Sequence, residues 1–180
     1  MNNRDLELHS FVRNCGFKGE DMISVKNDAS FRRYYRIKNK NLIVMDAPPD
    51  KGESIEQFRI VADIIHTFNL SAPQIESFDI KNGFMLLEDF GQTSFSNILN
   101  KDNESELYKK AIEVLIEINR QSKSKEKKLG TLKSYSIDLL VNESLLFIDW
   151  YLEKRNGKSV SSIQKKEFIQ ILNNFYNNIK

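Results

Sequence analysis

The stretch KNGFMLLEDFG at residues 81–91 decides how this chain is expected to fold. The tripeptide at 81–83 is typical of a tight turn, and the four apolar residues at 84–87 form a run that favours a buried central strand. A short segment at 75–78, introduced by Pro73, lies just before the turn. We therefore predict two strands joined by a turn, the second of them in the interior of a sheet.

Working toward the N-terminus, the pattern continues as short strands around one helix. Three strands separated by polar breaks are expected at residues 22–25, 31–37 and 42–45. The helix follows them, because Ser54 and Gln57 have the spacing of a capping box in front of apolar residues at helical spacing. A short amphipathic helix at 6–15 opens the chain. The predicted order after that first helix is βββαββ.

Beyond Gly91 the apolar residues recur at helical spacing. Three helical stripes are expected, at residues 107–118, 137–152 and 168–179. Ser161 and Gln164 again have the spacing of a capping box at the start of the last helix, and the basic stretch 120–133 is expected to be a solvated loop. A mixed sheet followed by helices predicts an α+β protein.

The composition excludes several classes of protein. The 180 residues include 40% hydrophobic and 29% charged side chains, and 27 Lys and Arg against 25 Asp and Glu give a net charge of +2. Such a chain can form a core, and it lacks the signature of disorder. The single Cys15 excludes a disulfide framework, and no apolar run approaches the roughly 18 residues of a membrane span. We expect a soluble, cytoplasmic protein without membrane contact.

The segment DASFRRYYR at 28–36 has an unusual concentration of arginines. Side chains alternate along a strand, so Arg33 shares its face with apolar and aromatic neighbours, while Arg32 and Arg36 lie on the other face. A guanidinium in such surroundings needs an anion that it can bind with two hydrogen bonds, either a carboxylate or a phosphate. The alternative is a sheet edge that charge keeps soluble.

Four pieces in order carry a resemblance to a known family: DASFRRYYR, LIVMDAPPDK at 42–51, GFMLLEDFG at 83–91 and NESLLFIDWYLEKRNG at 142–157. Together they resemble the N-acetylmuramate/N-acetylglucosamine kinases of the aminoglycoside phosphotransferase and choline kinase superfamily. The resemblance implies a protein-kinase-like N-lobe at 1–90, with an antiparallel sheet of about five strands and one main helix. Residues 91–180 would be the helical beginning of the C-lobe.

The resemblance also implies roles for individual residues. Asp28, Ala29 and Ser30 would form the nucleotide loop, whose backbone N–H groups approach the phosphates of ATP. The expected hinge between the lobes, where backbone groups would recognise adenine, consists of Glu88, Asp89 and Phe90. The triplet 89–91 spells the metal-binding triplet of protein kinases, but no His-x-Asp loop precedes it, so we interpret it as hinge rather than metal site.

Two departures from the family pattern matter. Kinases place a lysine on the third strand to hold the phosphates, and the run 42–46 has none. Either Arg32 or Arg33 would then supply the cation, with Glu56 orienting it, or backbone and metal would hold the phosphates. The second departure is that the catalytic loop and the metal-binding Asp are not found in this sequence, so the chain is expected to be a truncated or split N-terminal portion that is inactive alone.

The intact enzyme would transfer the γ-phosphoryl of ATP, with Mg²⁺, to a hydroxyl of an N-acetyl amino sugar in cell-wall recycling. A complementing C-terminal chain or self-association would then be expected. Two other functions stay open. One is a pseudokinase-like module that binds a nucleotide or a partner without catalysis. The other is a nucleic-acid-binding module that uses the basic strand at 31–40, which the small net charge disfavours.

Overall fold

The computed structural model of the protein describes residues 3–26, 30–124, 132 and 135–178. The chain divides into two compact units, residues 1–129 and 130–180. The first contains the sheet and the helices up to α4, and the elements described in the second are helical. The fold is therefore α+β, as expected from the sequence. The expected boundary after residue 90 separates the sheet from the helical remainder and stays a prediction.

The sheet has five strands, and every neighbouring pair is antiparallel. Their bounds are β1 Met22–Ser24, β2 Arg33–Ile37, β3 Leu42–Asp46, β4 Ile75–Asp79 and β5 Phe84–Glu88. The order across the sheet is β1-β2-β3-β5-β4, so β5 lies between two other strands. The prediction that residues 84–87 form a buried interior strand is thus confirmed, since all four side chains are buried.

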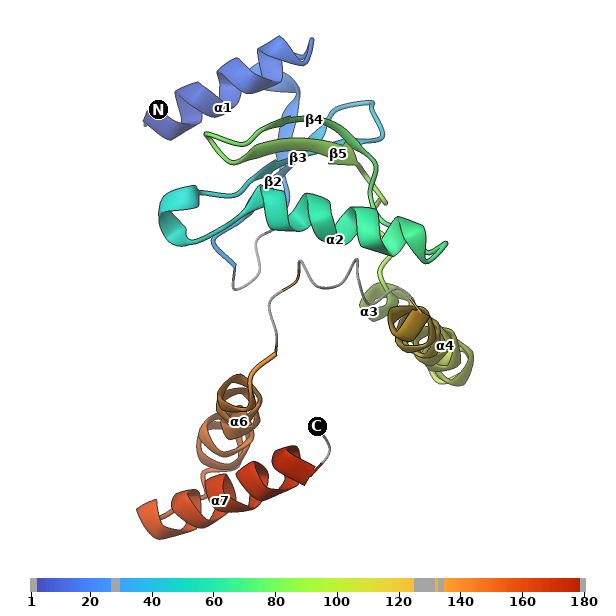
Figure 1. Ribbon diagram of the computed structural model, residues 1–180. Helices are drawn as coiled ribbons and strands as arrows, with labels where there is room; N and C mark the ends of the chain where they lie inside the picture. Colours follow the sequence, from blue (N-terminus) through green and yellow to red (C-terminus); the bar gives the residue numbers. More distant parts are fainter. Residues whose placement is uncertain (1–2, 27–29, 125–131, 133–134, 179–180) are drawn as a thin grey trace. The chain divides into compact units, whose positions relative to one another are not determined.

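Two helices cover the opposite faces of this sheet, α1 (Asn3–Asn14) on one face and α2 (Ile55–Thr67) on the other (Figure 1). The alternation along β5 divides its side chains between them. Phe84 and Leu86 pack with α1 residues such as Phe11, whose ring centroid lies 5.7 Å from that of Phe84. Met85 and Leu87 pack with Ile55 of α2. The unit thus has three layers with an apolar core on each side of the sheet.

Both predicted capping boxes lie where helices begin. The Ser54 hydroxyl accepts a hydrogen bond from the Gln57 backbone N–H at 3.2 Å, which satisfies one free donor at the start of α2. At α7 (Ser162–Asn178) the box is reciprocal, because Ser161 accepts from the Gln164 N–H and the Gln164 side chain accepts from the Ser161 N–H. Side-chain chemistry therefore fixes where these helices start.

The first two strands are shorter than the sequence predicts. The Ser30 hydroxyl accepts a hydrogen bond from the Arg32 backbone N–H at 3.1 Å, and this turn takes that N–H out of the ladder, so β2 begins only at Arg33. On β1, the Val25 N–H still donates to the Tyr34 carbonyl at 2.8 Å, one residue beyond the strand's end. The chain around residues 27–29 lies outside the described residues.

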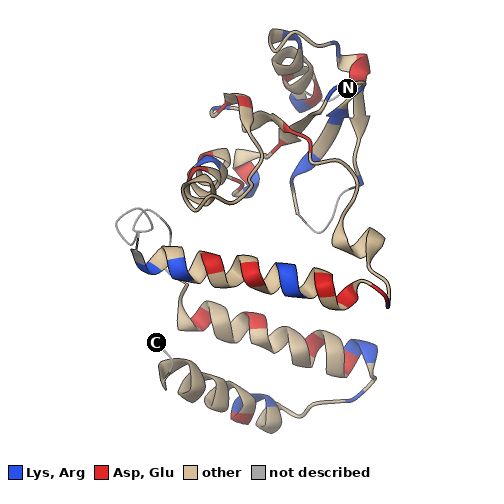
Figure 2. Cartoon of the chain, turned by 90° about the vertical axis from the view of Figure 1, so that its right-hand side faces the viewer, with Lys and Arg blue, Asp and Glu red and all other residues tan. Residues whose placement is uncertain are grey.

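The remaining helices follow the expected stripes with two differences. The first is that the helix over 107–118 continues to Ser124, into the stretch 120–133 that was expected to be a loop. Their bounds are α3 Phe95–Ile98, α4 Glu104–Ser124, α6 Ile137–Leu146 and the π-helix η3 Phe147–Arg155, and short 3₁₀ turns occupy Gly19–Asp21 and Pro49–Lys51. The second is that the stripe predicted as one helix over 137–152 changes to π-helical bonding after Leu146. Charges of both signs are spread along α4, where Lys110 pairs with Glu106 at 2.7 Å (Figure 2). Among the described residues, no helix is long and apolar enough to cross a membrane.

Candidate nucleotide pocket

A cavity of about 670 Å³ lies between the end of β1, the end of β2 and the segment that follows β5. Its size is in the range of pockets that hold small organic ligands. Its apolar side chains are Ile23 and Val25 at β1, and its cations are Lys26 and Arg36. The other wall is polar and comes from the residues after the sheet, Gly91, Gln92, Ser94 and Asn97. A ligand with an apolar ring and an anionic part fits this combination of walls.

The register of the sheet explains why these side chains meet. Ile23 is directly opposite Arg36 in the β1–β2 pair, and Arg36 is opposite Ile43 in the β2–β3 pair. Directly opposite residues in an antiparallel pair share a face. Ile43 packs in the α2-side core, so Ile23 and Arg36 belong to the α2 face of the sheet.

Arg36 ties β2 to the segment that leaves the sheet. Its Nε donates to Asp89 Oδ2 at 2.5 Å, and its Nη2 donates to Asp89 Oδ1 at 3.3 Å and to the Gly91 carbonyl at 2.6 Å. The Gly91 N–H donates back to Asp89 Oδ1 at 2.8 Å. These bonds fix Asp89 of the segment predicted as hinge, and Gly91 directly after that segment, against the sheet.

The buried Asp89 carboxylate is occupied as an ion-pair partner. Burial raises the pKa of Asp89, but the hydrogen bond from Arg36, the Gly91 N–H and the positive charge of Arg36 together lower it by more, so the pKa lies below its ordinary value. An aspartate held in this way is not an open metal ligand. In the part of the chain that the structure describes, no cluster of three His, Cys, Asp or Glu side chains could hold a metal ion.

The other two expected hinge residues differ in their surroundings. Glu88 ends β5, its N–H donates to the Gln74 carbonyl at 2.9 Å, and its side chain accepts from the Gln74 N–H at 3.3 Å. Phe90 is exposed, with 58% of its surface accessible. Residues 88–90 thus form the exit from the sheet, next to the pocket wall at Gly91.

Ser30, the last residue of the expected nucleotide loop, and Arg32 both contact Glu53. The Arg32 Nε donates to Glu53 Oε2 at 2.7 Å, and the Ser30 hydroxyl donates to Glu53 Oε1 at 3.3 Å. Burial lowers the pKa of Arg32, but the hydrogen bonds and charges of Glu53 and Tyr34 raise it by more, so this cation is held in its charged form. Asp28 and Ala29, the other predicted loop residues, lie outside the described residues.

Arg33 points to the opposite face of the sheet and is not brought to the pocket. Its Nε donates to Asp46 Oδ2 at 2.8 Å, and both Nη atoms donate to Asp5 Oδ1 at 3.1 Å. Arg4 of α1 also pairs with Asp46 and donates to the Asn82 carbonyl at 2.9 Å. The expectation that Arg33 binds an anion through more than one hydrogen bond is confirmed, and its partners are carboxylates. A role of Arg33 toward phosphate stays a prediction.

Glu56, which was expected to orient the arginine, is exposed on the first turn of α2. The ion pairs among residues 3–26, 30–124 and 135–178 do not include it. The carboxylate that contacts Arg32 is Glu53, three residues earlier and ahead of the helix. Sequence reasoning also missed Arg36 as a pocket residue, although alternation along the strand put it on the same face as Arg32.

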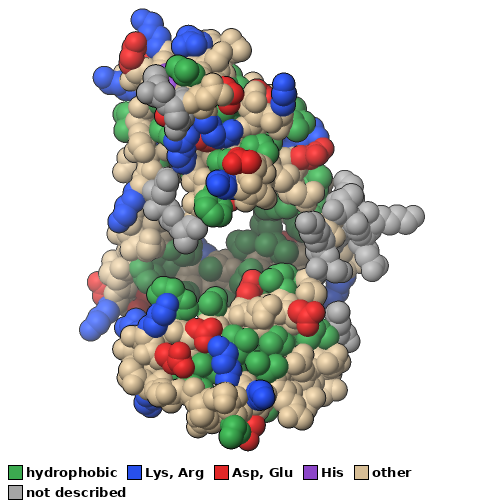
Figure 3. All heavy atoms as spheres, turned by 90° about the vertical axis from the view of Figure 1, so that its left-hand side faces the viewer, with side chains coloured by type: hydrophobic (Ala, Val, Ile, Leu, Met, Phe, Trp, Pro, Cys, Tyr) green, Lys and Arg blue, Asp and Glu red, His purple; other side chains and the backbone are tan. Residues whose placement is uncertain are grey.

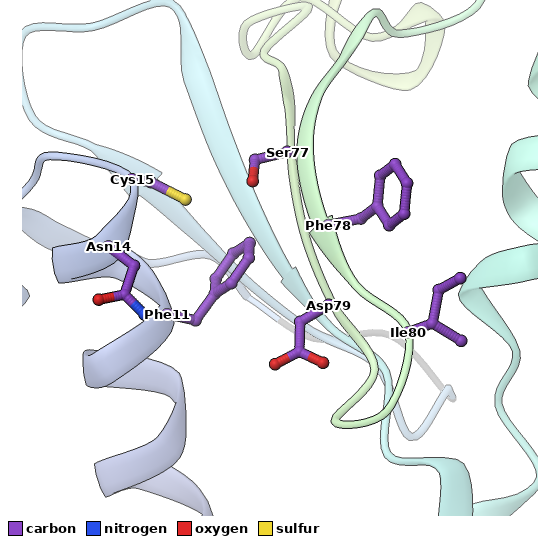
Figure 4. Close-up of a pocket in the computed structure, with 7 residues that line it drawn as sticks. All are labelled: Phe11, Asn14, Cys15, Ser77, Phe78, Asp79 and Ile80. Carbon is purple, nitrogen blue, oxygen red and sulfur yellow. The ribbon is translucent and has the colours of Figure 1, made fainter.

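A second cavity of about 480 Å³ lies on the α1 side, between the end of α1 and β4 (Figure 4). Phe11 and Cys15 come from α1, and Ser77 and Asp79 come from β4. No lysine or arginine is among its described lining residues, and the Asp79 carboxylate would repel a phosphate. The pocket beside Arg36 is therefore the better candidate for an anionic ligand.

Comparison with known proteins agrees with the resemblance in the sequence. A protein named N-acetylmuramate/N-acetylglucosamine kinase from Pseudomonas aeruginosa is 35% identical over 139 residues, which are 76% of this chain and 39% of that protein. Proteins of the same name from Pseudomonas putida and Neisseria meningitidis are 32% and 29% identical over 80% and 81% of the chain. No model of a protein family matches the chain. The chain spans about two fifths of the length of these relatives.

Proposed function

We propose that this chain is the nucleotide-binding part of an ATP-dependent phosphotransferase that acts on an amino sugar. The observation that carries the proposal is the pocket beside Arg36, in a chain similar to proteins named as amino-sugar kinases. Ile23 and Val25 suit a nucleobase, Lys26 gives the pocket a positive charge, and Arg36 lines it as a guanidinium paired with Asp89. Such a combination suits a nucleotide better than a neutral ligand.

In this proposal the sheet and its two helices act as a kinase-like N-lobe. The loop at 28–30 would approach the phosphates through its backbone, and residues 88–90 would recognise the base through theirs. ATP would bring Mg²⁺ with it. Phosphoryl transfer also needs carboxylates that orient the acceptor hydroxyl and hold the metal. We propose that these come from a polypeptide segment other than the present one, either in a longer chain or in a complementing chain.

The proposed acceptor is an N-acetyl amino sugar, phosphorylated at a hydroxyl, with the anomeric one favoured, during recycling of the cell wall in the cytoplasm. This rests on the names of the relatives. The sugar site would be formed mainly by the part of the enzyme that this chain does not include. We also propose that the chain belongs to the same kinase family as these relatives, within the aminoglycoside phosphotransferase superfamily.

The first test is nucleotide binding by the chain itself. We expect titration calorimetry to show binding of Mg·ATP and a phosphate-release assay to show no ATP hydrolysis beyond the buffer rate, because in this proposal the catalytic carboxylates lie on another segment. Adding a polypeptide that covers the remaining length of the Pseudomonas aeruginosa relative should give ADP release that depends on N-acetylmuramate or N-acetylglucosamine. Absence of any nucleotide binding at millimolar concentration would overturn the proposal.

A second candidate function, binding of a partner protein, is favoured by the surface of residues 130–180. Large apolar side chains are more than 50% exposed there: Leu146, Trp150, Ile163, Ile171 and Phe175. Figure 3 shows hydrophobic side chains between charged ones on this unit. Exposed apolar groups on this scale are typical of interaction surfaces. Sedimentation velocity should show concentration-dependent self-association, and a monomer at all concentrations would contradict this candidate.

Binding of nucleic acid is disfavoured by the contacts of the basic strand. Each of its three arginines is paired with a carboxylate, Arg32 with Glu53, Arg33 with Asp5 and Asp46, and Arg36 with Asp89. Paired guanidinium groups contribute little to counterion release from a phosphate backbone. The exposed lysines Lys38 and Lys40 are then the cations of the segment 31–40 that no described ion pair includes.

A further inference from the structure

The sheet offers no cation from β3 to the nucleotide side. The β3 side chains on the α2 face are Ile43 and Met45, which pack in the apolar core beneath α2. Met45 is fully buried. Kinases need a fixed cation near the phosphates, because the transferred group carries several negative charges. A cation for this purpose must come from another element.

Three arginines of the basic segment can be compared for this role. Arg33 lies on the α1 face, where it is bonded to two carboxylates. Arg36 is bonded to Asp89 and to the Gly91 carbonyl, beside the segment proposed to recognise the nucleobase. Arg32 is at the other end of β2, beside the loop expected to contact the phosphates, and its side chain is 30% exposed. Arg33 is as exposed as Arg32, at 31%, but it lies on the other face of the sheet, so position favours Arg32.

We propose that Arg32 holds the phosphates of the nucleotide and that Glu53 is the positioning residue that fixes it. The inference rests on the proposed function and specifies how that site recognises a polyphosphate. An arginine directly ahead of β2 and a glutamate ahead of α2 would replace the lysine that this chain lacks on β3. The bond to Glu53 uses Nε, and the guanidinium also hydrogen-bonds Tyr34, so its remaining Nη N–H groups can donate to a phosphate.

The contacts of Glu53 suit a positioning role. One carboxylate oxygen accepts from Arg32 and the other from Ser30, so the Glu53 side chain fixes both the cation and the last residue of the expected loop. Glu53 directly precedes Ser54, the N-cap of α2, and its own side chain is only 17% exposed. A guanidinium already fixed in this way loses less conformational entropy when it binds a phosphate.

The experiment compares ATP with adenosine, because adenosine has the base and ribose without the phosphates. We expect wild type to bind Mg·ATP more tightly than adenosine. Arg32→Met should lose about tenfold or more in ATP affinity, since a charge-assisted hydrogen bond is removed, with adenosine affinity unchanged. Arg32→Lys should restore part of the loss. Glu53→Gln, which keeps the cation but not its fixed partner, should lose about threefold or more for ATP only.

Lys38→Met is the matched control, because it removes one exposed positive charge at the opposite end of β2. We expect it to leave both affinities within twofold of wild type. Arg32 does not hold the phosphates if Arg32→Met prefers ATP over adenosine as strongly as wild type does. The same conclusion follows if the variant loses as much affinity for adenosine as for ATP. An effect of Arg32→Met with none of Glu53→Gln overturns the positioning role. If wild type binds neither ligand, the proposed function itself fails.

Discussion

Replacing Asp46 by asparagine should lower the free energy of unfolding by about 3–5 kcal/mol, as expected when one partner of a buried ion pair is removed. The Asp46 side chain is fully buried, and it pairs with Arg4 of α1 and Arg33 of β2. In the variant, both guanidinium groups would keep their charge in a partly buried place while losing the carboxylate they share. Urea unfolding followed by circular dichroism would measure the change.

Glu56→Gln is the control for this experiment, because it also neutralises a carboxylate but on the exposed surface of α2. We expect a change within about 0.5 kcal/mol for it. These ion pairs also connect α1 to the sheet, because Arg4 of α1 pairs with Asp46 and Asp5 of α1 pairs with Arg33. If Asp46→Asn lowers the free energy of unfolding by less than about 1 kcal/mol, the ion pairs of Asp46 with Arg4 and Arg33 stabilise the protein no more than a surface ion pair does.

The order and type of the elements of the sheet could be predicted from local sequence, because each depends on short-range chemistry. Ser54 and Gln57 mark the start of α2 through a hydrogen bond within one turn. The run 84–87 specifies an interior strand because every side chain is apolar. Alternation also placed Arg33 on a different face from Arg32 and Arg36, as the structure shows.

The partners of those arginines could not be predicted, because they depend on how strands pair. Arg36 and Asp89 are 53 positions apart and meet through the pairing of β2, β3 and β5, which no local pattern specifies. Asp46 is different, since the short β2–β3 connection puts Arg33 directly opposite it. That signal was present in the sequence, and counting back from the turn finds it.

The choice between Glu53 and Glu56 shows a second limit. Both are acidic residues near the start of α2, and the sequence favoured Glu56 because it lies on the helix. The structure instead uses the residue before the N-cap, where the chain is still extended and passes beside Arg32. Similarly, the apolar spacing over 137–152 predicts a helix but does not distinguish i+4 from i+5 bonding, so the π-helix was not anticipated.

Arg36→Met should lower the free energy of unfolding by about 3 kcal/mol at pH 7, because it leaves Asp89 buried without its partner. It should also reverse the pH dependence of the stability that Asp89 contributes. In wild type the pKa of Asp89 lies below its ordinary value, so the stabilisation is present above the unfolded pKa of about 3.9 and is lost as pH falls through the lower folded pKa. Without Arg36, burial dominates and raises the pKa of Asp89. The variant then gains stability as pH falls toward about 4, because the buried carboxylate takes up a proton.

The stability difference between wild type and Arg36→Met should therefore be largest near pH 7 and shrink toward pH 4, as measured by urea unfolding at a series of pH values. Combining Arg36→Met with Asp89→Asn should recover much of the loss at pH 7 and abolish its pH dependence, because no charge is left to bury. Lys40→Met, in the exposed turn between β2 and β3, should show neither effect. A difference that is constant with pH would mean that Arg36 stabilises this segment through its bond to the Gly91 carbonyl and its packing, and not through the charge of Asp89.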